Sequence, residues 1–272
     1  LAYQTFSGVH IRAYSEQPDE AMAADDLWTY QALGDIAEEL TGYPSISGYH
    51  DFRYHPKSVI RGVGTDWAYD HLGVYAWTTE FWNALVAAGL DESHPLEWYR
   101  THPLDEELQL LAWVDDNVPG GYVEWYEYDH PQLGRVELGG WNSELVFRNP
   151  PSHLLADEIA PHSPLAIRLA LSSPLLRHRE TLVDALGDDT WRVRVVIENA
   201  GWMTTAVTDR ARESGYVQPM VARIELPADA SLAMGTERIE LGQLAGRALK
   251  QNAVRSFSVS SDGTDDRTVA EW

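Results

Sequence analysis

The spacing of hydrophobic positions predicts a long helix near the start of the chain. Apolar residues recur at helical intervals from Leu27 to Leu40. Asp25 or Asp26 stands where a helix cap is expected, and Gly42 follows the last apolar position. We therefore expect a helix over residues 25–40.

Shorter patterns predict further elements up to about residue 171. Apolar, β-prone runs indicate strands over residues 1–6 and 74–81, and alternation indicates two more over 122–129 and 134–138. Short helices are expected over 66–72 and 105–114, the second capped by Asp105, and a helix interrupted by prolines over 153–171. The His- and Tyr-rich stretch 43–58 is expected to be a loop or a short strand.

The pattern changes after Pro174, where strands dominate. Residues 190–199 alternate with period two, which places Val193, Val195 and Ile197 on one face and Arg192, Arg194 and Glu198 on the other. Similar runs occur over 220–226, 238–241 and 254–260, separated by turn residues. Short strands at this spacing are typical of a β-sandwich. We predict an α/β part over residues 1–176 and a β-sandwich over 177–272.

Composition narrows the classes of partner. The chain has 272 residues, 44% of them hydrophobic, and a formal net charge of -22, which disfavours nucleic acids and anionic membranes. Cysteine is absent, so a zinc site would need His and carboxylate ligands. No apolar run is long enough for a transmembrane segment and no signal peptide is visible. Both ends look cut within strands, so we expect a fragment of a longer protein.

One motif combines several of these elements. Asp66-Trp67 opens a short helix, Gly73 ends it, and the following apolar run ends in Glu80. An isolated Glu is usually an ordinary surface residue, but a carboxylate at the end of a buried strand lies at the rim of a sheet, where ligands bind in α/β folds. The order of residues resembles the signature of the zinc carboxypeptidases (carboxypeptidase A-like). The resemblance implies that Glu80 is the general base that activates a zinc-bound water, and that Asp66 is structural.

The opening strand carries a second part of the resemblance. Residues Gln4-Thr5-Phe6-Ser7 match a family segment in which a zinc-ligand His is followed by Ser or Thr, an aromatic residue and Ser. Gln4 stands at the position of that His, and an amide is a poor zinc ligand beside imidazole. The other family ligands would precede residue 1. Zinc is therefore implied by the family but expected to bind weakly or not at all. His10 is interpreted as a structural or surface residue.

Other candidates are less specific. A family tyrosine covers the substrate, and its strict position is occupied by Ser58, so the nearest candidate for a substrate contact is Tyr54, the alternative being an ordinary loop aromatic. The spacing of the remaining His and Asp residues of this region does not match a zinc site, so we expect them at the surface: His50, Asp51, His55 and His71.

The aromatic stretch Tyr122–Tyr128 has two interpretations. It would serve as a sugar-stacking platform if its rings were exposed, and its alternation favours a half-buried strand. Residues 129–140 also resemble a segment of bacterial carboxypeptidases and are expected to form a structural hairpin, with glycines supplying the turns.

Taken together, the resemblance implies part of a mixed, doubly wound carboxypeptidase-like sheet with helices. The implied protein is a secreted or cell-surface bacterial zinc metallocarboxypeptidase that releases C-terminal residues from peptides. The alternative is a non-catalytic protein that binds peptides or glycans on the same scaffold and has lost its metal. The oligomeric state is not indicated by the sequence.

Overall fold

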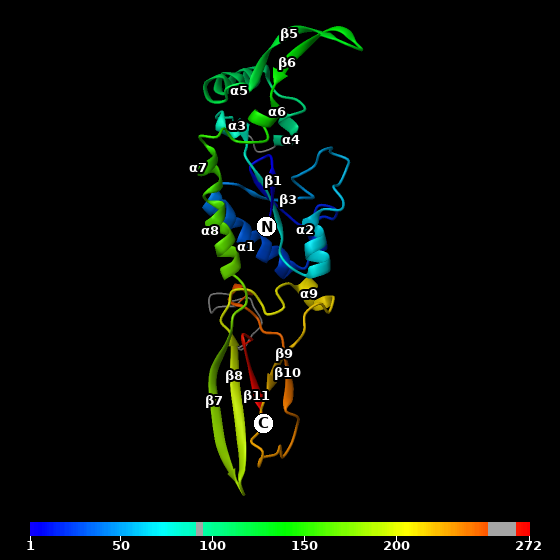
Figure 1. The fold of residues 1–272 in the computed structure, drawn as a ribbon. Helices are drawn as coiled ribbons and strands as arrows, with labels where there is room; N and C mark the ends of the chain where they lie inside the picture. Colours follow the sequence, from blue (N-terminus) through cyan, green and yellow to red (C-terminus); the bar gives the residue numbers. More distant parts are fainter. Residues whose placement is uncertain (91–94, 250–264) are drawn as a thin grey trace, which may run out of the picture. The chain divides into compact units, whose positions relative to one another are not determined.

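The computed structural model describes residues 1–90, 95–249 and 265–272 (Figure 1). Contacts divide the chain into two compact units. Unit 1 comprises Leu1–Met22, Tyr30–Asp66 and Ala76–Ala166, and unit 2 comprises Ala23–Thr29, Trp67–Tyr75 and Ile167–Trp272. The predicted division at residues 176 and 177 stays a prediction, because grouping by contacts does not test whether either part folds independently.

Unit 1 is organised around a mixed four-stranded sheet. Its strand order is β1 (Ala2–Thr5), β4 (Trp77–Phe81), β2 (Val9–Arg12), β3 (Ser45–Ser47). Strand β4 pairs in parallel with β1 and antiparallel with β2, and β2 pairs in parallel with β3. Helices accompany this mixed sheet, which confirms the general α/β class. Strand β2 was not predicted, because only three residues separate it from β1.

The two faces of this sheet differ in chemistry. Val9 and Ile11 form a buried apolar cluster with Phe52. His10 and Thr79 lie on the opposite face, because successive side chains of a strand point to opposite sides. The His10 ring is fully buried, with Nδ1 2.8 Å from Thr79 Oγ1 and Nε2 2.9 Å from Thr41 Oγ1. Of the two interpretations of His10, structural or surface, the surface one is wrong, because the ring is buried and hydrogen-bonded at both nitrogens.

Helix α1 (Ala24–Thr41) covers the His10 face, and its extent agrees with the predicted helix. The ring of Tyr30 packs edge-on against Trp77 of β4, with ring centroids 5.0 Å apart. The Tyr30 hydroxyl also accepts a hydrogen bond from the backbone N–H of Ala76 at 3.1 Å. Because this N–H is bonded to a side chain, the strand predicted from residue 74 begins only at Trp77.

A second apolar cluster of unit 1 lies among short helices. These are α3 (Ala84–Ala87), α4 (Pro95–Trp98), α5 (Leu104–Asn117) and α6 (Ser143–Val146). Helix α5 begins one residue before Asp105 and has Pro103 at its N-cap, so the predicted capping role of Asp105 is wrong. Proline suits this place because it has no N–H to leave unpaired. The buried residues of the cluster include Trp82, Leu85, Trp98, Leu110, Val114 and Val146.

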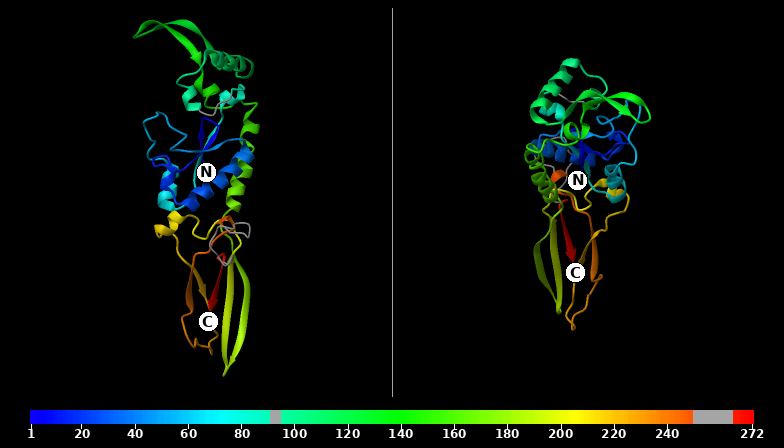
Figure 2. Two further views of the ribbon diagram at one scale, coloured as in Figure 1. Left: turned by 180° about the vertical axis from the view of Figure 1, so that it is seen from behind. Right: turned by 45° about the horizontal axis from the view of Figure 1, so that its top comes forward.

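The predicted hairpin is present as β5 (Tyr122–His130) and β6 (Gly134–Trp141), an antiparallel pair. Figures 1 and 2 show it extending away from helices α5 and α6. The prediction that residues 122–128 form a half-buried strand is wrong, because every residue from Val123 to Asp129 is exposed. Alternation along a strand implies burial only where another layer covers one face.

The remaining helices of the first 171 residues follow the sequence with small shifts. The helix predicted over 66–72 is α2 (Gly64–Trp67) continued by a π-helical turn, η2 (Ala68–Leu72). The helix predicted over 153–171 is divided into α7 (Leu155–Ile159) and α8 (His162–Leu171). The break falls at Pro161, whereas Pro164 is accommodated in the first turn of α8. A short 3₁₀ helix, η1 (Asp19–Ala21), precedes α1.

Unit 2 contains two small antiparallel sheets. One has the order β11 (Arg267–Glu271), β8 (Thr190–Asn199), β7 (Leu176–Gly187), and the other pairs β10 (Arg238–Gly242) with β9 (Met220–Arg223). Helix α9 (Asp209–Glu213) and the 3₁₀ helix η3 (Arg247–Leu249) complete the described elements. The strand predicted over 254–260 lies outside the described residues.

Strand β8 has the predicted limits and is the central strand of its sheet. Val195 lies opposite the fully buried Ala270 of β11. Arg194 points to the other face, where its guanidinium lies 2.8 Å from the carboxylate of Asp184 on β7. The alternation therefore separates an apolar face from one with cross-strand ion pairs, although both faces are only half-buried.

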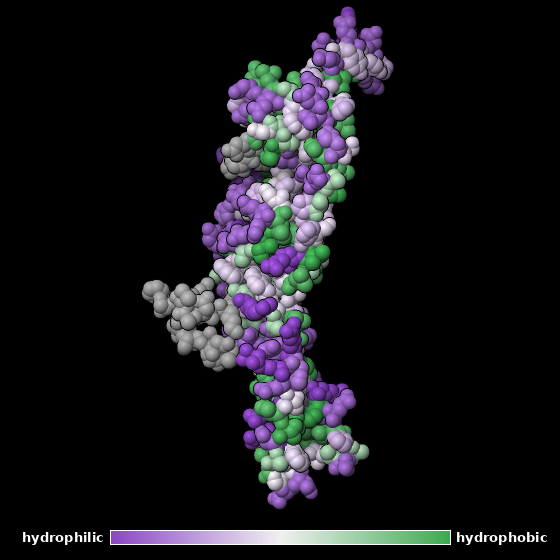
Figure 3. Space-filling view, turned by 90° about the vertical axis from the view of Figure 1, so that its left-hand side faces the viewer, coloured by the Kyte–Doolittle hydropathy of each residue, from purple (hydrophilic) through white to green (hydrophobic). Residues whose placement is uncertain are grey.

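No helix in the described ranges has the length and hydrophobicity needed to span a membrane. Figure 3 shows hydrophobic and hydrophilic residues interspersed over the face that it draws.

A buried carboxylate, Asp26, holds several segments of unit 2 together. Its Oδ2 accepts a hydrogen bond from the Tyr69 hydroxyl at 2.6 Å, and its Oδ1 accepts one from Tyr75 at 3.1 Å. The backbone N–H groups of Asp209 and Arg210, at the start of α9, donate to Oδ1 and Oδ2 at 2.8 and 3.1 Å. One side chain therefore satisfies four donors from two distant stretches of the sequence.

We predict that Asp26→Ala destabilises the protein by about 2–4 kcal/mol, because four donors lose their acceptor in a buried place. Asp25→Ala is the matched control, since Asp25 is the exposed neighbour on the same helix. Urea unfolding of the two variants measures the effect. Equal midpoints for both variants would show that the Asp26 contacts contribute nothing to stability.

Candidate functional site

Glu80 lies near the carboxyl end of the central strand β4. In the parallel pair it stands directly opposite Gln4 of β1, and in the antiparallel pair it stands opposite Val9 of β2. Residues opposite each other share a face of a sheet. Glu80 is therefore on the same face as Val9 and its neighbour Phe52, away from α1.

The Glu80 carboxylate is buried and hydrogen-bonded through both oxygens. Only 5% of the residue is exposed. The Gln4 amide donates to Oε1 at 3.0 Å, and the Ser7 hydroxyl donates to Oε2 at 2.8 Å. Burial raises the pKa of Glu80, and the hydrogen bonds from Ser7 and Gln4 oppose that rise. The structure thus brings together the two sequence segments, 4–7 and 66–80, that motif analysis had linked.

Tyr54 belongs to the same region of unit 1. Burial raises the pKa of the Tyr54 phenol, and the negative charge of Glu80 raises it further. The ring packs edge-on against Phe52 with centroids 5.6 Å apart, and 60% of the residue remains exposed. Tyr54 is therefore an accessible phenol that senses the charge of a buried carboxylate.

A cavity of about 670 Å³ opens beside this pair, within the size range of small-ligand sites. Its apolar wall includes Val9, Phe52 and Trp82. Ser7 connects the two features, because it lines the cavity and donates to Glu80. Neither Glu80 nor Gln4 lines the cavity. The acidic, basic and histidine residues that line it are His50, Asp51, Arg53, Glu97, Arg100 and Glu158.

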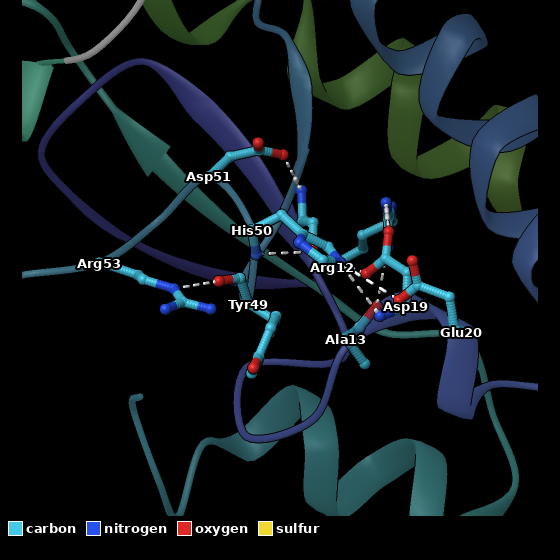
Figure 4. Close-up of polar contacts among 9 residues, drawn as sticks. Arg12, Ala13, Asp19, Glu20, Tyr49, His50, Asp51 and Arg53 are labelled. Carbon is cyan, nitrogen blue, oxygen red and sulfur yellow. Dashed lines mark hydrogen bonds and ion pairs between the residues drawn. The ribbon is translucent and has the colours of Figure 1, made fainter. Parts of the chain in front are cut away.

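A polar network fixes the turn that leads to Tyr54 (Figure 4). The guanidinium of Arg12 pairs with the carboxylate of Asp19, and the pKa of Asp19 is lowered overall, since the Arg12 and Ser47 contacts outweigh burial. Asp19 also accepts a hydrogen bond from Ser47 Oγ at 2.7 Å, and Asp51 accepts one from the backbone N–H of Ser47 at 2.9 Å. The carboxylate of Asp19 thereby balances the charge of the buried Arg12, and its bond to Ser47 fixes the start of the turn.

The end of the turn is held by Arg53. Its side chain donates to the Tyr49 carbonyl and its guanidinium lies 4.2 Å from the centre of the Tyr49 ring. Figure 4 shows Arg53 directed toward Tyr49. Tyr54 therefore follows a turn whose first residue, Ser47, is bonded to Asp19 and whose last residue, Arg53, is bonded to Tyr49.

The structure places the other predicted residues away from any metal site. His50, Asp51, His55 and His71 are exposed, as expected. Over residues 1–90, 95–249 and 265–272, no group of three or more His, Asp or Glu side chains is arranged to hold a metal ion. Asp66 accepts hydrogen bonds from the backbone N–H groups of Ser15 and Glu16 at 2.9–3.1 Å, which fits the structural role that the resemblance implied.

Sequence reasoning missed a cluster at the other end of the cavity. Tyr43 donates to Glu158, and its hydroxyl accepts the N–H of Trp82 at 2.9 Å. The ring of His162 lies 5.0 Å from Tyr43 and 5.6 Å from His10, centroid to centroid. Burial, followed by the charge of His162, lowers the pKa of His10 to about 4. These residues come from separate elements, and no local pattern relates them.

Comparisons with known proteins bear on unit 2 alone. Residues 175–272 match the model of a family described as a domain of unknown function (DUF8731). A search of curated proteins found no match to the chain. The matched residues exclude the sheet that carries Glu80, so the match gives no information about this site.

We predict that Glu80→Gln stabilises the protein at neutral pH. The amide keeps partners for Gln4 and Ser7 but carries no charge into the buried site. Because the folded-state pKa of Glu80 is raised, its favourable contribution is complete below the ordinary Glu pKa near 4.5 and is lost as the pH rises through the raised value. The gap in melting temperature between variant and parent should therefore widen upward from about pH 4.5.

Thermal melts between pH 4 and 8 measure this gap. Glu39→Gln is the control, because Glu39 is an exposed acid of the same unit on helix α1. A parent protein more stable than Glu80→Gln at neutral pH would show that Gln4 and Ser7 more than offset the cost of burying the charge.

Proposed function

We propose that unit 1 includes part of a carboxypeptidase A-like peptidase domain, with Glu80 at the position of the general base. The observation that carries the proposal is the 3.0 Å hydrogen bond between Gln4 and Glu80. The two residues are 76 positions apart, and the family motifs assign both to one site. The proposed substrate is a peptide, and the reaction is the release of its C-terminal residue by hydrolysis.

The surroundings of Glu80 support proton transfer by this carboxylate. A general base works best when its pKa lies near the working pH, and burial shifts the pKa of Glu80 in that direction. Ser7 and Gln4 fix the orientation of its two oxygens. Tyr54 is accessible and lies within the electrostatic influence of Glu80, which supports its proposed role as a substrate contact.

Zinc, which the family resemblance implies, does not fit the residues of this chain. Zinc would polarise the scissile carbonyl and acidify a water molecule. A catalytic zinc needs three protein ligands, whereas Gln4 directs its amide N–H₂ group to Glu80. The described residues contain no other candidate group of ligands. We therefore assign no step of the reaction to zinc in this chain.

This mismatch favours a second candidate function, the binding of a peptide or glycan without hydrolysis. The Gln4–Glu80 hydrogen bond gives each group a partner without a metal, which supports a site that binds a ligand without hydrolysis. The cavity beside Ser7, with its apolar wall and charged rim, supports ligand binding on the same scaffold. A scaffold shared with enzymes does not by itself carry their activity.

Two further features belong to the proposal. The sheets of unit 2 are proposed to form a β-sandwich that accompanies the peptidase-like part. A secreted or cell-surface location is proposed from the family resemblance.

We predict that this chain binds zinc only weakly and does not cleave a blocked dipeptide ending in phenylalanine. Calorimetric titration with zinc chloride and a ninhydrin assay for released phenylalanine measure the two properties. Gln4→His in a longer chain that supplies the preceding family ligands should produce tight, stoichiometric zinc binding.

The two candidate functions differ in a second measurement on the chain itself. Quenching of tryptophan fluorescence by the dipeptide reports on the cavity, because Trp82 lines it, and Trp82→Phe identifies the part of the signal that arises there. Binding without cleavage supports the non-catalytic function. Tight zinc binding together with cleavage by the unmodified chain would show that Gln4 does not prevent zinc binding. The absence of both peptide binding and cleavage would refute both candidate functions.

A further inference from the structure

The β5–β6 hairpin is the most exposed aromatic surface in the described part of unit 1. The exposed fractions are 59% for Trp125, 53% for Tyr126 and 44% for Tyr128. Folded proteins normally bury aromatic side chains of this size, and exposed apolar groups clustered on a rigid element mark interaction surfaces. Figures 1 and 2 show that the distal part of this hairpin has no other element of unit 1 beside it.

The strand register separates the side chains of the hairpin into two chemically distinct faces. Tyr126 stands opposite Leu138 and Tyr128 opposite Val136, so these four share one face. The intervening residues, Glu127 opposite Glu137 and Asp129 opposite Arg135, share the other face. One face is therefore aromatic and aliphatic without charge, and the other is predominantly acidic.

The acidic face carries fewer positive charges than negative charges. Glu127 and Glu137 lie directly opposite each other, an arrangement that destabilises a strand pair. Arg135 pairs with Glu127, whereas no ion pair of Asp129 or Glu137 occurs among the described residues. Strand β5 carries three carboxylates and neither Lys nor Arg. The hairpin itself does not balance this charge.

The outer edge of β5 is also open. The hairpin is a sheet of two strands, so within the described residues β5 pairs only with β6. A two-stranded hairpin is marginally stable in water, and a third strand adds backbone hydrogen bonds and cross-strand contacts. A strand beside β5 would present alternate side chains to Tyr126 and Tyr128 on one face and to Glu127 and Asp129 on the other.

We propose that the β5 edge binds an extended basic segment of another protein by strand addition. The segment has Lys or Arg at every second position, opposite Glu127 and Asp129, and apolar residues between them, opposite Tyr126 and Tyr128. A second copy of this chain is a poor occupant, because pairing β5 with β5 would bring like charges together. The acidic face thus prevents self-association and selects a basic partner.

The test uses three blocked peptides and the full chain. One alternates valine and lysine over about eight residues, enough to match a typical strand. The second alternates valine and glutamate, and the third has the composition of the first in two blocks, so that alternation is lost at constant charge. Calorimetry at physiological salt should show binding of the first peptide alone.

Variants identify the surface. Glu127→Lys with Asp129→Lys should weaken binding of the valine–lysine peptide on the order of tenfold. The same variant should gain binding of the valine–glutamate peptide. Glu38→Lys with Glu39→Lys makes the same change in net charge at exposed positions of α1 and should leave both affinities unchanged. Melting temperatures of the two variants check that the fold is retained.

Several results would overturn the proposal. Equal binding of the alternating and block peptides, or equal losses in the two double variants, would show general attraction to an acidic protein. No binding of the alternating peptide would exclude strand addition. Concentration-dependent dimers abolished by Tyr126→Ser with Tyr128→Ser would assign the hairpin to self-association instead.

Discussion

The fold of unit 1 depends on the burial of a polar strand at the centre of its sheet. Thr78, Thr79 and Glu80 of β4 are all buried, although each carries a group that needs hydrogen-bond partners. The surrounding elements supply them for Thr79 and Glu80. On one face, His10 connects Thr79 to Thr41 of α1, which fixes the end of the helix on the sheet. The low pKa of His10, about 4, keeps this ring neutral and able to donate at one nitrogen and accept at the other.

The hydrogen bonds on the two faces of β4 differ in their effect on the free energy of folding. Thr79 and His10 are both neutral at physiological pH, so their hydrogen bonds involve no buried charge. Glu80 is satisfied in number of hydrogen bonds, yet its charged form is disfavoured by burial. A buried charge of this kind does not favour fold stability. Charged groups that are held in a fixed orientation beside a cavity are typical of functional sites. This asymmetry supports the assignment of the site to the Glu80 face.

Much of the local structure was predictable, because local signals determine it. The limits of α1 and β8 follow from periodicity and flanking turn residues. The approach of Gln4 to Glu80, 76 positions apart, was expected from the family resemblance alone. Contacts between distant residues that no motif relates were not predictable, such as Asp26 with the start of α9. Exposure of the β5–β6 hairpin was misjudged for a related reason, since alternation reveals two different faces but not whether another layer covers one.

Gln4 explains why the electrostatics of the site differ from those of a metal centre. A cation next to Glu80 would stabilise the carboxylate and lower its pKa. In this structure the contributions that lower the pKa of Glu80 come from the neutral hydroxyl of Ser7 and the neutral amide of Gln4. Burial, which raises the pKa, outweighs them. The raised pKa of Glu80 therefore reflects burial beside neighbours that carry no charge. A residue that supplies a hydrogen bond without a charge orients this carboxylate but leaves its proton affinity high.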